Sequence, residues 1–337
     1  MRKGIGIDLG GSYFRVCLPG MGIVIREPAF AAVNRESNQI VKFGSAAEAY
    51  LKEQPKNVIM TRPFRGGVMQ ASEVAQKLFS RCRKRCIQEG DTSYRTLLSV
   101  PCALTDVEQS AMIEVAVNAG LSEPYLAYAP LAALYGSGFT VEDSVMMVTV
   151  GATKTDILAL YGGYCVYMDS TDAAGDMFDE AIVSYVQKNY SVRLNMRTAE
   201  TVKMRIGTVW TGAPQRSLEL GGMDPYGNRK TVKISSEEMF SILEEPTALL
   251  VESVCKAITS LPLEAVKGIF DTGILLSGGG AKLEGLDKMI AGVTGVRCRR
   301  VEQPEDAVAR GLEGLLAVAP SNIRSGCYNF SEFLFRK

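Results

Sequence analysis

Two segments that lie far apart in this chain follow the same plan of a short apolar strand, a glycine-bearing turn and a returning strand. The first spans residues 4–18, with the turn Gly10-Gly11-Ser12, and the second spans residues 145–161, with the turn Gly151-Ala152-Thr153. One unit repeated within a chain indicates two halves of like fold. We therefore expect two similar domains with a cleft between them.

A third glycine turn, Ser277-Gly278-Gly279-Gly280, follows a buried strand near the end of the chain. Three glycines leave the backbone without Cβ atoms, so a flat ring can lie against it. The N–H groups at the start of the following helix can also face an anion. A single glycine-rich turn is more often a simple chain reversal, so the prediction of a nucleotide site rests on all three turns together.

Composition excludes several classes of function. The 337 residues are 47% hydrophobic and 22% charged, which predicts about two globular domains. Lys+Arg and Asp+Glu both number 37, so no net charge attracts nucleic acid, and we expect no nucleic-acid partner. The absence of histidine from the sequence excludes histidine bases and histidine metal sites.

Cysteine spacing and hydropathy point to the cytoplasm. The eight cysteines contain no CxxC pair, so we expect reduced thiols rather than a zinc site. The chain enters a strand within its first residues, so we expect no signal peptide. No apolar run in the sequence reaches the length of a membrane span.

The three turns fall in the order and spacing of the two phosphate turns and the adenosine turn of the actin-like ATPase superfamily. Within that superfamily the chain most resembles the MreB family of bacterial actins, and the likeness extends to about Leu316. Other matching segments are Gly22-Ile23-Val24-Ile25-Arg26-Glu27-Pro28, Val100-Pro101 with Thr105-Asp106-Val107-Glu108, Ala174-Gly175-Asp176, and Thr198-Ala199-Glu200 with Lys203.

The resemblance implies an α/β, actin-like (ribonuclease H-like) fold with a nucleotide cleft between two domains. Domain I comprises residues 1–141, with subdomain IA at 1–33 and 68–141 and subdomain IB at 34–67. Domain II comprises residues 142–320, with subdomain IIA at 142–185 and 255–320 and subdomain IIB at 186–254. Residues 321–337 then form a C-terminal tail.

The resemblance also implies ATP or ADP as the ligand. The phosphates lie against the two phosphate turns, residues 175 and 176 close on the nucleotide, and the adenosine meets a helix and the glycine triplet. Asp8 is assigned to a Mg2+ ion, held through water. The nucleotide-binding residues implied are Gly10, Gly11, Ser12, Tyr13, Gly151, Ala152, Thr153, Lys154, Gly175, Asp176, Glu200, Lys203, Gly278, Gly279, Gly280 and Lys282.

The residues needed for hydrolysis depart from the family pattern. Ala129 stands where the family carries a glutamate that orients the attacking water, and Thr149 stands where it carries an aspartate. Because neither replacement supplies a carboxylate, we expect no catalytic residues and very slow or absent hydrolysis.

The residues at the two phosphate turns allow alternatives. Lys154 either lies near the phosphates, which lowers the need for Mg2+, or points to solvent. Bulky Tyr13 and Phe14 leave open an occluded site that binds no nucleotide.

The resemblance favours a cytoskeletal protein that assembles with itself into filaments and contributes to cell shape or intracellular organisation. The alternatives are a small-molecule kinase and an adaptor or chaperone-like module of the same fold. A kinase needs a base beside its acceptor, and we find no second carboxylate site. Aromatic residues beside Arg336 and Lys337 give the tail two alternatives, a contact at the inner membrane or packing onto its own domain or a neighbouring subunit.

Overall fold

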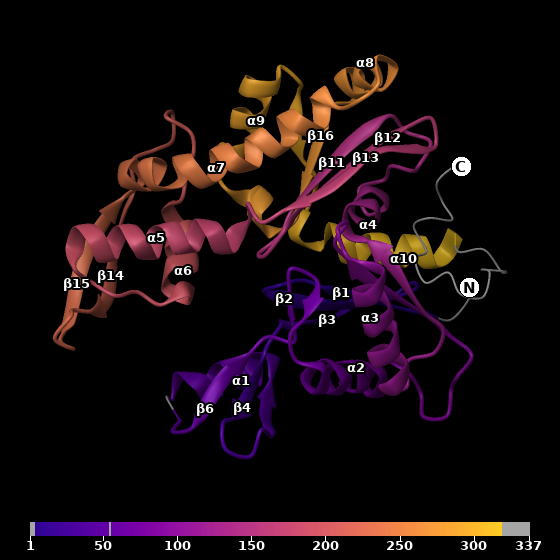
Figure 1. Cartoon of the computed structure of the whole chain (residues 1–337), viewed down its shortest axis with the longest axis horizontal. Helices are drawn as coiled ribbons and strands as arrows, with labels where there is room; N and C mark the ends of the chain where they lie inside the picture. Colours follow the sequence, from indigo (N-terminus) through magenta and orange to yellow (C-terminus); the bar gives the residue numbers. More distant parts are fainter. Residues whose placement is uncertain (1–3, 54, 319–337) are drawn as a thin grey trace. The chain divides into compact units, whose positions relative to one another are not determined.

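The computed structural model describes residues 4–53 and 55–318 (Figure 1). Its contacts divide the chain into two compact units. The first unit comprises residues 4–141 together with 306–318, and the second comprises residues 142–305. The tail assigned to residues 321–337 lies outside the described residues.

A five-stranded sheet forms the centre of the first unit. Its first strand pairs antiparallel with the strand that follows it and parallel with a strand from later in the chain. In spatial order the strands are β10 (Pro124–Tyr128), β9 (Arg95–Val100), β1 (Gly4–Leu9), β2 (Tyr13–Leu18) and β3 (Gly22–Pro28). Ile5 and Ile7 on β1 are fully buried, which explains why this short apolar segment forms a central strand.

The rest of the first unit consists of helices and two small sheets. The small sheets are β5 (Ile40–Phe43), β4 (Ala31–Asn34) and β6 (Val58–Thr61), and the ribbon of β7 (Phe64–Arg65) and β8 (Val68–Met69). The helices are α1 (Gly44–Lys52), α2 (Ser72–Cys86), α3 (Asp106–Asn118), α4 (Ala129–Tyr135) and α10 (Ala307–Val318). A capping box between Thr105 and Glu108 fixes where α3 begins.

The last helix, α10, packs on α4 and β1 of the first unit, whereas the assignment from sequence placed residues 255–320 together in domain II. Glycines explain the packing. A Cβ atom on Gly311 would collide with the carbonyl oxygen of Ala132 in α4, and one on Gly136 would collide with that of Ala307. The two helix backbones therefore approach more closely than larger residues allow.

The second unit is built around a sheet of the same plan. Its strands, in spatial order, are β13 (Tyr164–Thr171), β12 (Thr155–Tyr161), β11 (Val145–Val150), β16 (Ile274–Ser277) and β17 (Cys298–Arg300). As in the first unit, the first strand in the chain pairs antiparallel with its successor and parallel with a later strand. The prediction of two halves of like fold is confirmed.

The remaining elements of the second unit surround this sheet. They are the helices α5 (Gly175–Tyr190), α6 (Met196–Ile206), α7 (Ser236–Thr259), α8 (Leu263–Thr272) and α9 (Leu286–Thr294), the hairpin of β14 (Ser217–Met223) and β15 (Arg229–Ser235), and the short 3-10 turns η1 (Gly279–Lys282) and η2 (Pro304–Asp306). Within the described part of the chain, no helix is both long and apolar enough to cross a membrane.

We expect Gly311→Ala to lower the free energy of unfolding of the first unit by about 1–3 kcal/mol, because the added methyl group forces α10 away from α4. Thermal unfolding followed by circular dichroism measures the change. Gly292→Ala in α9 is the matched control, since a Cβ atom there meets no atom within 4 Å. That substitution should be neutral or slightly stabilising, and an equal loss in both variants would contradict the packing account.

Candidate nucleotide site

The first glycine turn joins β1 to β2. A side chain on Gly10 would collide with the carbonyl oxygen of Tyr13, so the turn requires glycine at that position. Tyr13 is 43% exposed, whereas Phe14 is 2% exposed and belongs to the core of the first unit. Of the two bulky residues at this turn, only Tyr13 is exposed.

Asp8, at the end of β1, is buried and paired. The hydroxyl of Ser99 donates a hydrogen bond to its Oδ1 at 2.8 Å and accepts one from the Leu9 N–H at 2.9 Å. Nη1 of Arg15 lies 3.5 Å from its Oδ2. Burial raises the pKa of Asp8, and the positive charge of Arg15 and the Ser99 hydrogen bond oppose that rise.

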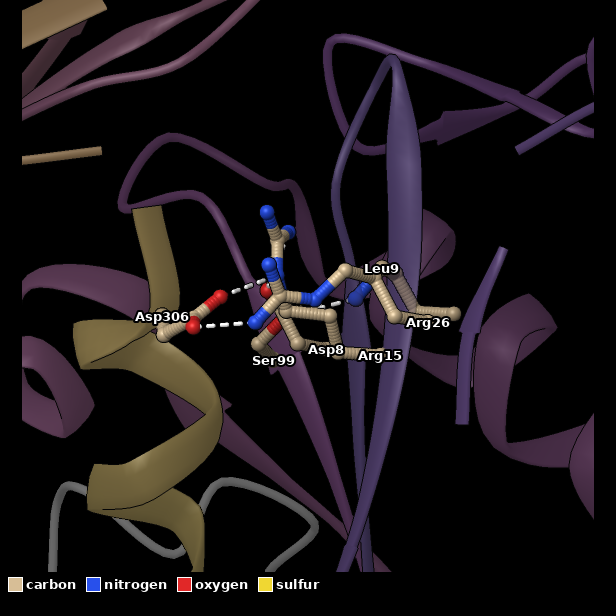
Figure 2. A network of polar contacts seen from close by, with 6 residues as sticks. All are labelled: Asp8, Leu9, Arg15, Arg26, Ser99 and Asp306. Atoms are coloured by element: carbon tan, nitrogen blue, oxygen red, sulfur yellow. Dashed lines mark hydrogen bonds and ion pairs between the residues drawn. The ribbon is translucent and has the colours of Figure 1, made fainter. Parts of the chain in front are cut away.

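Asp8 belongs to a cluster of four charged side chains, which we call the Asp8 ion cluster: Asp8, Arg15, Arg26 and Asp306 (Figure 2). Nε of Arg15 donates to Oδ1 of Asp306 at 2.9 Å, and Arg26 from β3 donates to the other oxygen of Asp306. Sequence reasoning found only Asp8. The hairpin register is the signal that could have located Arg15, because it stands directly opposite Asp8.

The second glycine turn lies against the start of α5. The N–H of Gly175 donates to the carbonyl oxygen of Gly151 at 3.1 Å, and that of Asp176 donates to Ala152 at 2.6 Å. A Cβ atom on Gly175 would lie 3.2 Å from the Cα of Ala152, so the approach is close. The structure thus brings together four of the residues predicted to bind the nucleotide.

The glycine triplet, from a later part of the chain, packs against Val150. Gly278 has a φ angle of 82°, and a side chain there would collide with the carbonyl oxygen of Val150, the residue just before the second turn. A side chain on Gly280 would collide with the Val150 side chain, whereas one on Gly279 would meet no protein atom within 4 Å. Packing therefore requires Gly278 and Gly280, and Gly279 leaves open space.

Two predicted lysines form ion pairs near these turns. Nζ of Lys154 lies 2.9 Å from the exposed carboxylate of Asp172, which offsets its charge, and Nζ of Lys282 lies 2.7 Å from Glu305. These pairs are partly exposed, so their contribution to stability is small.

A third predicted lysine, Lys203, links α6 to α5. Its Nζ donates to the carbonyl oxygen of Gly175 at 3.0 Å and lies 2.9 Å from Oδ1 of Asp179. Glu200 lies one helical turn before it and is half-buried. Burial raises the pKa of Asp179 to about 6, against the opposing effect of Lys203. In the sequence, Asp179 lies in a segment that matches the family pattern, one helical turn after Asp176, but the pattern assigned it no role in the site.

Neither of the two positions assigned to hydrolysis carries a carboxylate in the structure. Ala129 is the first residue of α4 and offers only a methyl group. Thr149 is buried on β11, with its hydroxyl 2.8 Å from that of Ser277. A buried carboxylate, Asp156, stands opposite Thr149 on β12 and accepts a hydrogen bond from Ser170. Among the described residues, no group of three or more Cys, Asp or Glu side chains is arranged to hold a metal ion.

Comparison with known proteins settles the family. The family model described as MreB/Mbl protein matches residues 2–322. The chain belongs to the MreB/Mbl family. It is 32% identical over 313 residues to the cell shape-determining protein Mbl of Bacillus cereus, with 92% of this chain and 94% of that protein covered. It is also 32% identical over 316 residues to the cell shape-determining protein MreB of Escherichia coli, with 91% of each covered.

Solved structures show that the fold is actin-like. The crystal structure of MreB5 of Spiroplasma citri bound to ADP matches with a TM-score of 0.89 and 26% identity, over 94% of this chain and 97% of that chain. The MamK double helical filament matches with a TM-score of 0.80 and 19% identity, over 95% of this chain and 100% of that chain. The fold class predicted for this MreB/Mbl protein is confirmed.

The raised pKa of Asp179 predicts how stability depends on pH. Its pKa of about 6 in the folded state exceeds its ordinary value of 3.8, so the folded state binds more protons between these values. The resulting stabilisation is complete below about pH 4 and is lost as pH rises through about 6. Relative to Asp179→Asn, the wild-type free energy of unfolding should fall by up to about 3 kcal/mol across that window.

Urea unfolding followed by tryptophan fluorescence makes this measurement. The chain contains one tryptophan, Trp210, and it lies in the second unit with Asp179. Parallel pH profiles for the wild type and Asp179→Asn would contradict the assignment.

Proposed function

We propose that this MreB/Mbl protein binds ATP or ADP and assembles with itself into filaments that contribute to cell shape or intracellular organisation. The observation that carries the proposal is the convergence of three segments within the second unit. The second turn, the first residue of α5 and the glycine triplet are joined by backbone contacts around residues 150–152. The names of the Mbl and MreB relatives, and the ADP bound to Spiroplasma MreB5, support the same function.

In the proposed site, the backbone of the second turn binds phosphate beside the N-terminus of α5. The N–H groups of Gly175 and Asp176 already donate to carbonyl oxygens of that turn, so α5 contributes through its dipole rather than through those two hydrogen bonds. The first N–H groups of a helix carry a partial positive charge, and α5 is 16 residues long. Gly279 supplies bare backbone for the adenosine side, because no protein atom occupies the space that its side chain would fill. Gly10, Gly11 and Ser12 supply the corresponding phosphate turn of the first unit.

The proposed function includes binding with little or no hydrolysis. Transfer of a phosphoryl group to water requires a group that orients the water, and the methyl group of Ala129 can neither donate nor accept a hydrogen bond. Thr149 is engaged by Ser277. Assembly would then be governed by nucleotide binding rather than by turnover.

The proposed partner is a second copy of this chain, and the proposed location is the cytoplasm. MamK, which shares the fold, forms a double helical filament. For the tail at residues 321–337 the proposal keeps the two roles that its composition allows, a contact at the membrane or packing onto its own domain or a neighbouring subunit.

A combined sedimentation and phosphate-release experiment tests the function. We expect the full chain to pellet with ATP, to show filaments by negative-stain microscopy, and to release little phosphate. Ala129→Glu restores a carboxylate and should raise phosphate release about tenfold or more, since a positioned base typically contributes about 10²–10⁴-fold. Ala129→Gln is the matched control, with the same length and no base, and should stay at the wild-type rate.

Two outcomes would contradict the proposal separately. The absence of filaments with any nucleotide would favour the adaptor alternative. Wild-type phosphate release equal to that of Escherichia coli MreB measured alongside would disprove the loss of hydrolysis.

A further inference from the structure

The carboxylate assigned to a cation by the family resemblance is already paired within the first unit. Oδ1 of Asp8 accepts the Ser99 hydroxyl, and Oδ2 faces the guanidinium of Arg15 at 3.5 Å. Both charged side chains are nearly enclosed, with 9% of the Asp8 side chain and 11% of the Arg15 side chain exposed. A divalent cation beside Asp8 would therefore meet a fixed like charge.

Two further contacts hold Arg15 in this position. Its Nε donates to Asp306 at 2.9 Å, so one guanidinium bridges two carboxylates (Figure 2). Arg26 holds the other oxygen of Asp306 and so keeps that carboxylate oriented toward Arg15. A planar guanidinium paired on two sides is more firmly placed than a lysine would be.

Arg15 also lies directly at the first glycine turn. Its Nη1 is 4.0 Å from the point where a side chain on Gly10 would begin. The guanidinium of Arg15 thus lies close both to the Asp8 carboxylate and to the turn assigned to the phosphates.

The residues of the first unit therefore do not fit the family's water-held Mg2+ ion. A cation at such a site neutralises two sets of negative charge, those of the carboxylate and those of the phosphates. Here the carboxylate has its own counter-ion. The second family position supplies no carboxylate either, because Thr149 carries a hydroxyl that pairs with Ser277.

We propose that Arg15 is a built-in counter-ion for Asp8, so that this protein binds adenine nucleotide without a divalent cation. Arg15 acts as a positioning residue that holds Asp8 in its ion pair and removes an unpaired negative charge from the phosphate turn. The inference rests on the proposed nucleotide-binding function and adds to it the loss of the metal requirement.

Titration of the full chain with fluorescently labelled ADP, in excess Mg2+ and in EDTA, tests the inference. We expect the dissociation constant measured in EDTA to agree with that measured in Mg2+ within about threefold, which is a small difference in binding free energy. Binding that weakens about tenfold or more in EDTA would overturn it while leaving the proposed function intact. Binding in neither condition would overturn the proposed function and, with it, this inference.

Variants of the cluster sharpen the test. Arg15→Leu leaves Asp8 without its counter-ion, so binding in EDTA should weaken about tenfold or more, and Mg2+ should restore it. Arg15→Lys keeps the charge and should recover much of the metal independence. Arg26→Leu is the comparison variant, because it removes an arginine from Asp306 and leaves the pair of Arg15 and Asp8 in place. Its ratio of dissociation constants should change less than that of Arg15→Leu.

Circular dichroism reports whether each variant folds, and the wild-type comparison remains decisive if Arg15→Leu does not. Asp156→Asn tests the other carboxylate that could hold a cation, because Asp156 is buried on β12 of the second unit. A wild-type Mg2+ requirement that disappears in Asp156→Asn would place the cation there and overturn the inference. Unchanged, metal-independent binding in that variant supports it.

Discussion

The buried pair of Asp8 and Arg15 connects the hairpin of β1 and β2 to the helix that closes the first unit. Arg15 also holds Asp306, immediately before the first residue of α10, where negative charge is favoured by the helix dipole. Burial of charge is unfavourable unless every partner is present, and removing one partner typically costs about 3–5 kcal/mol. The cluster therefore links the hairpin of β1 and β2 to the start of α10.

The second unit carries different chemistry at the corresponding positions of its sheet. The corresponding pairs are Asp8 and Thr149 on the first strands, Arg15 and Asp156 on the returning strands, and Ser99 and Ser277 on the parallel neighbours. Both units have a serine on the parallel neighbouring strand. The carboxylate, however, lies on the first strand in the first unit and on the returning strand in the second unit. Side chains directly opposite each other in an antiparallel pair share one face, so the second unit retains a carboxylate near its turn despite the loss at Thr149.

The sequence was sufficient to predict the repeated halves, because strands and glycine turns leave local patterns. Through the family resemblance it assigned Gly175 and Asp176 to the same nucleotide site as the second turn, and the structure places these residues in contact with that turn. It failed for α10, whose contacts with β1 and α4 depend on residues separated by more than 150 positions. It missed Arg15 and Asp306 because a cluster drawn from strands and a distant helix has no sequence spacing of its own, although the register of one hairpin contained part of the answer. Whether Lys154 lies near phosphate could not be predicted, since its partner Asp172 lies on a separate segment.

The anomalous diffraction of Mn2+ in crystals of the full chain grown with ATP tests most directly whether Asp8 is reserved for an internal counter-ion. The account predicts that Oδ2 of Asp8 stays on Arg15, as it does here, with the nucleotide bound and no Mn2+ peak beside Asp8, either directly or across one water. A Mn2+ ion held by Asp8, with the Arg15 guanidinium turned away, would contradict the account.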